Sequence, residues 1–187
     1  LGTLKAEDGQ TLYTRLIKPY NFNPKKKYPV VIYVYGGPHA QMITDSWTAG
    51  AGIFLHYLSQ EGFIVFTLDN RGSADRGEAF EQVIHRQCGQ AEMRDQKVGI
   101  DYLKSLPYVD AERIGTDGWS YGGFMSTNMK INYPEDVKKI QAAGHDLGNH
   151  SENHKNMSQY VQKKAGIIFP ALLLFRLSQR TYLVSPG

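Results

Sequence analysis

One serine lies in a setting that could make it a nucleophile. Ser120 is part of the segment GWSYGG at 118–123, which follows the apolar-leaning run 113–117 and opens the helix-like run 124–130. Gly118 and Gly122 carry no Cβ, so a strand and a helix can approach closely on either side of a strained turn that exposes the hydroxyl. The segment therefore predicts a strand, a sharp turn and a helix, with Ser120 at the turn.

This spacing, Gly-x-Ser-x-Gly between a strand and a helix, is typical of the nucleophile elbow of α/β-hydrolases. Tyr35 is the second residue of interest, because it ends the apolar run 30–35 and precedes Gly36-Gly37-Pro38. In α/β-hydrolases, the loop after such a strand supplies a donor to the oxyanion hole. The alternative is a tyrosine that only packs at the end of a strand.

Strand-like and helix-like runs alternate around these residues. The turn signal 7–10 and the alternating run 11–17 predict an antiparallel opening hairpin, and the runs 30–35 and 63–68 are apolar enough to be strands buried on both faces. We expect helices over 47–60 and 91–106. The inward-facing residues would be Phe54, Leu55 and Leu58 in the first helix and Val98, Ile100, Tyr102 and Leu103 in the second. This alternation predicts an α/β fold with a mostly parallel sheet, helices on both faces and the elbow strand in the middle.

The composition limits the partners. The chain has 187 residues, a net charge of +3 and a single cysteine, Cys88. We therefore expect no nucleic-acid partner and no internal disulfide, and the redox compartment stays open. The run Lys25–Lys27 reads as a solvated loop. The longest apolar run, 165–175, contains a proline and is too short to span a bilayer, so no membrane partner is expected.

Three motifs carry a resemblance to a known family. YVYGGP at 33–38, DNRGS at 69–73 and GWSYGG at 118–123 follow one another in an order and spacing that resembles the catalytic domain of the prolyl oligopeptidase family. The likeness is closest to the dipeptidyl peptidase IV branch and covers about residues 5–129. It implies part of an α/β-hydrolase fold, a serine peptidase that removes N-terminal dipeptides from peptide substrates without a cofactor, and a preceding β-propeller domain that is absent here.

The resemblance also implies roles for individual residues. Ser120 would be the nucleophile, and the Tyr35 hydroxyl and the backbone N–H of Tyr121 would form the oxyanion hole. Arg71 would either hold a substrate carbonyl or order its own loop.

The other members of a catalytic triad are not found in the expected places. In this fold the chain order is serine, acid, histidine, so both partners should follow Ser120. The 67 residues after it (187 minus 120) end before the positions that the family uses, whereas His39, His56 and His85 precede it. We therefore expect an incomplete or inactive triad. The only replacement within reach would be Asp146 with His150 or His154.

A second resemblance covers residues 131–158. The segment HDLGNHSENH at 145–154 is similar to the second motif of the polysaccharide deacetylase family, in which His150 and His154 would bind a divalent metal. Their i, i+4 spacing places both imidazoles on one face of a helical turn. The paired aspartates that this family also needs are not found at 69–70, and the alternative is a solvent-exposed histidine-rich turn.

These patterns divide the chain into residues 1–130, the N-terminal part of a hydrolase domain; residues 131–158, a deacetylase-like segment; and residues 159–187, which match neither family. Two unrelated signatures on either side of residue 130 indicate a chimeric chain. The functional hypotheses are thus a serine peptidase through Ser120, a fragment of a metal-dependent deacetylase, or a chain without catalysis.

Overall fold

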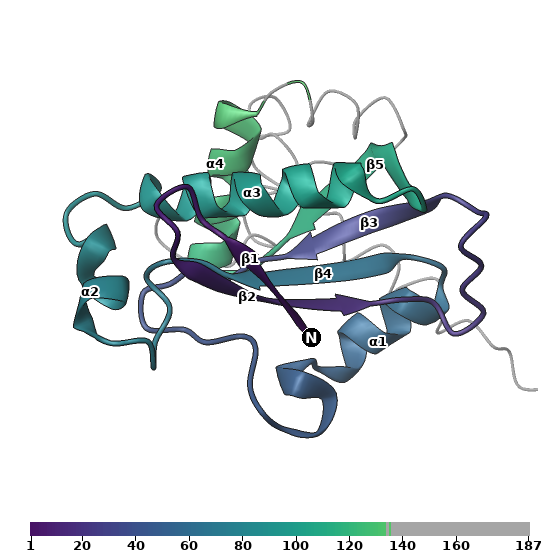
Figure 1. Cartoon of the computed structure of the whole chain (residues 1–187), viewed down its shortest axis with the longest axis horizontal. Coiled ribbons are helices and arrows are strands. Elements are labelled where there is room, and N and C mark those ends of the chain that lie inside the picture. Colours follow the sequence, from purple (N-terminus) through teal and green to yellow (C-terminus); the bar gives the residue numbers. More distant parts are fainter. Residues whose placement is uncertain (134, 136–187) are drawn as a thin grey trace, which may run out of the picture.

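The computed structural model of the protein describes residues 1–133 and 135 and shows one sheet with helices on both of its faces (Figure 1). The helices are α1 (Ile53–Gln60), α2 (Glu78–Glu81), α3 (Ala91–Ser105) and α4 (Tyr121–Asn132), with 3-10 turns η1 (Trp47–Gly50) and η2 (Gln82–Ile84). The strands are β1 (Gly2–Lys5), β2 (Thr11–Ile17), β3 (Tyr28–Tyr33), β4 (Ile64–Asp69) and β5 (Val109–Asp117).

The sheet is mixed, in the order β1-β2-β4-β3-β5. β3 is parallel to both β4 and β5, whereas β2 is antiparallel to both β1 and β4. The expected mostly parallel sheet is therefore wrong, because the predicted opening hairpin joins the sheet itself, with Leu16 beside Phe66 of β4. The elbow strand β5 also lies at the edge of the sheet formed by the described residues, not in its middle.

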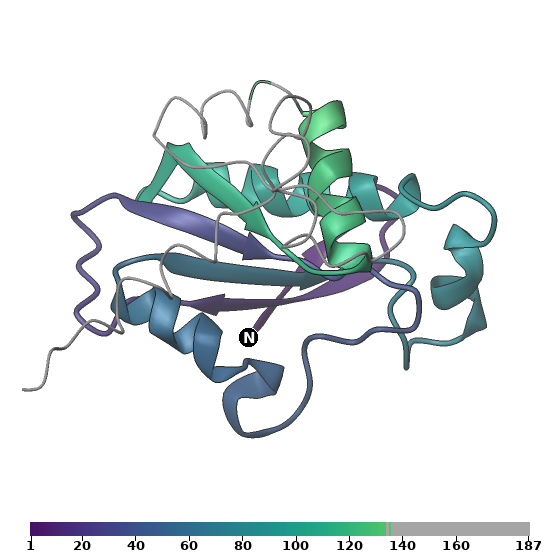
Figure 2. The ribbon, with the colours of Figure 1, turned by 180° about the vertical axis from the view of Figure 1, so that it is seen from behind.

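Alternating side chains build a core on each face of the sheet. All six residues of β4 are buried, as expected for a strand covered on both sides. On one face, Phe66 packs with Ile32 of β3 and with Leu103 of α3. On the other face, the preceding residue, Val65, packs with Leu55 of α1. Figures 1 and 2 accordingly show α1 on the opposite side of the sheet from α3 and α4.

The helix expected over 47–60 is interrupted. Thr48 and Ala49 have φ angles of 68° and 52°, so η1 ends before α1 begins at Ile53. Leu55 and Leu58 are buried as predicted, but Phe54 is 41% exposed because it lies outside the stripe of α1 that faces the sheet. Within residues 1–133 and 135, none of the helices has the length and apolar character needed to cross a bilayer.

The second predicted helix is present as α3, but its inward face is more polar than expected. Ile100 and Leu103 are buried, whereas Val98 and Tyr102 are only half-buried. The N-terminal half of the same helix buries three polar side chains. They are Glu92, Asp95 and Gln96.

Candidate active site

The predicted elbow is confirmed by the backbone around Ser120. β5 ends at Asp117 and α4 begins at Tyr121, and Ser120 between them has φ 56° and ψ −119°. A positive φ at a non-glycine residue costs about 1–3 kcal/mol, so the surrounding structure must hold it in place. The Ser120 carbonyl helps to do so, because it accepts hydrogen bonds from the N–H groups of Gly123 (2.9 Å) and Phe124 (3.2 Å).

Both elbow glycines are required by a close approach to Val34, the residue that follows β3. A Cβ at Gly118 would lie 2.3 Å from the Val34 carbonyl oxygen, and one at Gly122 would lie 2.2 Å from the same atom. The two glycines also approach each other, since a Cβ at Gly118 would be 2.8 Å from the Gly122 carbonyl. The Val34 N–H donates to the Asp117 carbonyl at 2.8 Å. The elbow therefore rests directly on the residue before Tyr35.

The structure brings Tyr35 and the elbow together at one end of the sheet. A Cβ at Gly122 would be 3.3 Å from the Tyr35 Cα, and the Tyr35 ring meets the Trp119 ring edge-on at 5.6 Å. Tyr121 is the first residue of α4, where a backbone N–H has no acceptor within its own helix. The arrangement thus places a half-buried serine beside a tyrosine and beside the Tyr121 N–H, which donates to no backbone acceptor within residues 1–133 and 135. The roles of Ser120, Tyr35 and Tyr121 in catalysis remain predictions.

The side chain of Tyr121 is anchored away from its amide. Its hydroxyl donates to Glu92 Oε1 at 2.6 Å, and its ring packs against that of Phe124 at 5.1 Å. Burial raises the pKa of the Tyr121 phenol, and the hydrogen bonds with Cys88 and Glu92 raise it further. The phenol therefore stays protonated and keeps its donor proton for Glu92.

Arg71 is held by acidic side chains. Its backbone N–H, Nε and Nη2 donate to the Asp95 carboxylate at 2.8, 3.0 and 2.7 Å, and its Nη1 pairs with Asp8. The hydrogen bonds to Asp95 raise the pKa of Arg71. These contacts support the alternative in which Arg71 orders its own loop. A contact between Arg71 and a substrate stays a prediction.

The loop that follows Tyr35 is fixed by a buried pair of opposite charges. Asp69 accepts the backbone N–H groups of Met42 (3.0 Å) and Ile43 (2.9 Å), while Arg15 donates to the carbonyls of Met42 (2.8 Å) and Ala49 (2.5 Å). Burial raises the pKa of Asp69 and lowers that of Arg15, since each charged form loses hydration. The hydrogen bonds offset this loss and hold the loop against the sheet.

Sequence patterns alone do not single out several of these residues. Arg15 lies in an alternating strand, and Glu92, Asp95 and Gln96 lie in a predicted helix. The spacing i, i+3, i+4 was a usable signal, because it places three polar residues on one helix face. Nothing local, however, distinguishes a buried polar face from a solvated one.

The three histidines before Ser120 lie on the wrong side of the chain order that the triad is expected to follow. Among the described residues, no hydrogen bond joins a histidine to Ser120: His39 pairs with Glu81 and is 74% exposed, His85 is exposed, and His56 belongs to α1. His150 and His154, the predicted metal ligands, lie outside the described residues, as does Asp146. Within residues 1–133 and 135, no group of three or more potential metal ligands is present.

Comparison with known proteins then decides the family. A model described as "Prolyl oligopeptidase family" matches residues 53–160, which is more than half of the chain. The chain belongs to the prolyl oligopeptidase family. This is a family of serine peptidases with an α/β-hydrolase fold, as the motifs of the chain predicted. The matched range includes residues 131–158 and gives the deacetylase resemblance no support. The division of the chain at residue 130 stays a prediction.

The relatives are dipeptidyl peptidases. The chain is 38% identical over 143 residues to dipeptidyl peptidase 8 of Homo sapiens, and 39% identical over 126 residues to a probable dipeptidyl peptidase 4 of Aspergillus fumigatus. These alignments cover 76% and 66% of this chain but only 16% of each relative.

Solved structures agree with this result. One is the crystal structure of a putative dipeptidyl aminopeptidase IV from Bacteroides ovatus, which superimposes on this chain with a TM-score of 0.70 and 55% sequence identity. The match covers 72% of this chain and 19% of the Bacteroides chain. The crystal structure of dipeptidyl peptidase 4 from Porphyromonas gingivalis matches with a TM-score of 0.62 and 35% sequence identity. This match covers 68% of the present chain and 18% of the Porphyromonas chain. In each of these alignments, the present chain therefore spans less than a fifth of the length of its relative.

The close approach at the elbow predicts the effect of adding one methyl group. Gly122→Ala would place a Cβ against the Val34 carbonyl, which is backbone and cannot move aside alone, so we expect a loss of roughly 2–4 kcal/mol in the free energy of unfolding. Gly52→Ala is the matched control, because a Cβ there meets nothing within 4 Å and should cost less than about 1 kcal/mol. Urea unfolding measures both, and equal losses would contradict the close approach.

The buried carboxyl group of Asp117 should make the free energy of unfolding depend on pH. Burial raises its pKa to about 6, although its carboxylate accepts the Gly118 N–H. Between the ordinary value near 3.8 and about 6, the folded chain holds more protons than the unfolded chain, so this residue's contribution to stability falls as pH rises. We expect Asp117 to remove roughly 1–3 kcal/mol of stability between pH 3.5 and pH 7.

Asp117→Asn does not titrate and should not show this loss. Urea unfolding at the two pH values therefore compares the variant with the unmodified chain. A pH dependence that is the same in both would show that Asp117 does not have a raised pKa.

Proposed function

We propose that this chain is the elbow-bearing part of a serine peptidase that removes dipeptides from the N-termini of peptides, with Ser120 as its nucleophile. The observation that supports this most is the strained turn at Ser120, held against Val34 by two glycines beside Tyr35. In the α/β-hydrolase elbow, a serine at such a turn exposes its hydroxyl at the end of the sheet. The relatives named as dipeptidyl peptidases support the dipeptide product.

The chemistry follows from the positions of these groups. The Ser120 Oγ attacks the scissile carbonyl carbon, and a general base takes the hydroxyl proton as the new C–O bond forms. The carbonyl oxygen becomes an oxyanion that accepts hydrogen bonds from the Tyr35 hydroxyl and the Tyr121 N–H. The leaving amine departs with the proton when the C–N bond breaks, and water then hydrolyses the acyl-enzyme.

The remaining groups are assigned to other parts of the protein. We propose that the general base and the carboxylate that orients it lie outside residues 1–133, which supply only the nucleophile and the oxyanion hole. Recognition of the substrate amino end would come from a further domain, a β-propeller in this proposal. The much greater length of the relatives supports this division.

A segment exchange tests the proposal with a complete triad. In the full-length Bacteroides ovatus relative, the matching part would be replaced by residues 1–133 of this chain, and hydrolysis of Gly-Pro-p-nitroanilide would be measured. The 55% identity makes a folded exchange feasible, and we expect kcat/KM to fall by less than about tenfold. Introducing Ser120→Ala into the exchanged segment should lower kcat by at least about 10⁴-fold. Hydrolysis that survives Ser120→Ala would remove Ser120 from the nucleophile role.

Tyr35 has its own test in the same exchanged enzyme. Tyr35→Phe keeps the ring and its contact with Trp119 but removes one oxyanion donor, so we expect kcat to fall by at least about tenfold with little change in KM. Tyr33→Phe is the matched control, because Tyr33 lies two residues earlier, at the end of β3. If Tyr35→Phe and Tyr33→Phe leave kcat equally high, the donor is another group.

A further inference from the structure

One face of α3 is polar and yet buried. Glu92 and Asp95 are each 0% exposed and Gln96 is 1% exposed, although carboxylates and amides are rarely buried without partners. Their spacing of three and four residues places them on one side of the helix. Asp95 holds Arg71, as described above. The other two reach the segments that carry the proposed oxyanion donors.

Glu92 reaches the elbow. Its Oε1 accepts the Tyr121 hydroxyl at 2.6 Å, and both of its oxygens accept the Gly89 N–H at 3.0 Å. Gly89 itself has φ 82°, and a Cβ there would lie 2.1 Å from Asn128 Nδ2 of α4. The start of α3 is therefore packed closely against α4, and the Glu92 carboxylate fills the position between them.

Gln96, one helical turn later, reaches the segment after Tyr35. Its Nε2 donates to Asn70 Oδ1 at 2.8 Å and to the Leu68 carbonyl at 3.1 Å. Asn70 is 0% exposed, and its Nδ2 donates to the Gly36 carbonyl at 2.7 Å. Gly36 follows Tyr35 directly. A chain of two buried hydrogen bonds thus connects α3 to the backbone that holds Tyr35.

We propose that Glu92 and Gln96 are positioning residues, which set the distance between the Tyr121 amide and Tyr35 so that both donate to one oxyanion. The inference rests on the proposed function, because it assigns a role to the same two donors. An oxyanion hole works only when its donors lie within about 2.7–3.1 Å of a single point. Tyr121 and Tyr35 belong to different segments. One rigid helix that bonds directly to Tyr121, and through Asn70 to the residue after Tyr35, can keep this spacing constant.

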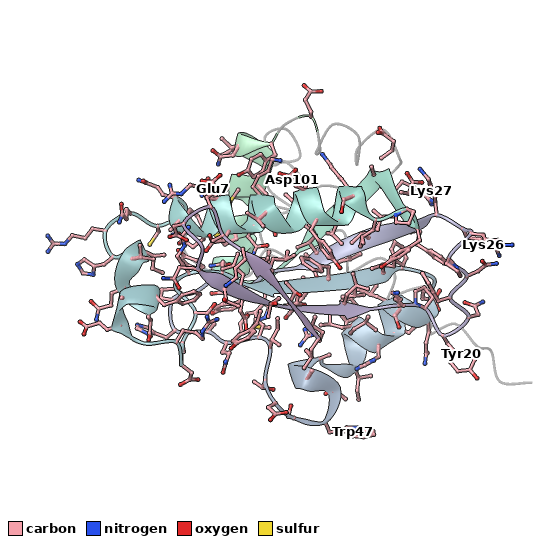
Figure 3. All side chains as sticks on the ribbon, viewed as in Figure 1. Glu7, Tyr20, Lys26, Lys27, Trp47 and Asp101 are labelled. Atoms are coloured by element: carbon pink, nitrogen blue, oxygen red, sulfur yellow. The ribbon has the colours of Figure 1, made fainter. Side chains whose placement is uncertain are left out.

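The kinetic test uses the exchanged enzyme described above. Glu92→Ala removes the acceptor for Tyr121, and we expect kcat to fall about tenfold to a hundredfold while KM changes less than about twofold. Glu92→Gln keeps an acceptor oxygen and should recover most of the loss. Asp101→Asn is the matched control on the same helix and should leave kcat unchanged. The Asp101 side chain, labelled in Figure 3, is 57% exposed and pairs with Lys97 of its own helix.

Two further variants separate positioning from loss of folding. If Glu92 acts through the Tyr121 hydroxyl, adding Tyr121→Phe to Glu92→Ala should lower kcat no further. Gln96→Leu should lower kcat in the same range through the Tyr35 side, and its effect should multiply with that of Glu92→Ala. A KM that rises together with the fall in kcat, or a Glu92→Gln variant as slow as Glu92→Ala, would overturn the proposal.

A measurement on the full 187-residue chain distinguishes this inference from the proposed function. With ¹⁵N-labelled tyrosine, Glu92→Ala should displace the backbone amide resonance of Tyr121, whereas Asp101→Asn should not. If the exchanged enzyme is inactive but this displacement is seen, the positioning by Glu92 holds and the assigned reaction fails. An unchanged Tyr121 resonance would overturn the positioning whatever the activity.

Discussion

The close contact between the elbow and the Val34 carbonyl is the constraint on which the rest of this structure depends. Two chain segments, the end of β5 and the start of α4, both approach this one oxygen, and a Cβ at Gly118 or Gly122 would lie closer than 2.5 Å to it. The contact fixes the turn, and the turn fixes the strained φ of Ser120. Because Val34 immediately precedes Tyr35, the same contact also fixes the backbone position of Tyr35 at the end of the sheet.

Strain of this kind persists only where the neighbouring segments are held firmly. In this protein the loops at the same end of the sheet are tied down by buried polar side chains: Arg15 and Asp69 hold the loop after Tyr35, and Asp95 holds Arg71. Removing such groups from water is costly, and their hydrogen bonds offset most of that cost. These buried polar side chains therefore add little to the free energy of unfolding, and their main effect is to fix a single arrangement of the loops.

Membership in the prolyl oligopeptidase family gives these local features a common context. The described residues contain the part of the fold that, in our proposal, supplies a nucleophile and stabilises an oxyanion. They do not contain a histidine bonded to the serine, and the chain spans 16% of the curated relatives and 19% of a solved one. The division is physically reasonable, because the elbow and the oxyanion donors are built from adjacent strands, whereas a base must reach the serine from elsewhere.

The amino-acid sequence by itself determined the local features of this protein: the elbow at Ser120, the buried strand β4 and the opening hairpin follow from patterns within about ten residues. Only the tertiary structure decided that the hairpin makes the sheet mixed, and that Glu92, Asp95 and Gln96 of α3 are buried. The physical reason is distance along the chain. Asp95 finds its partner 24 residues away and Arg15 reaches across 52, and no short-range pattern records which polar groups will meet.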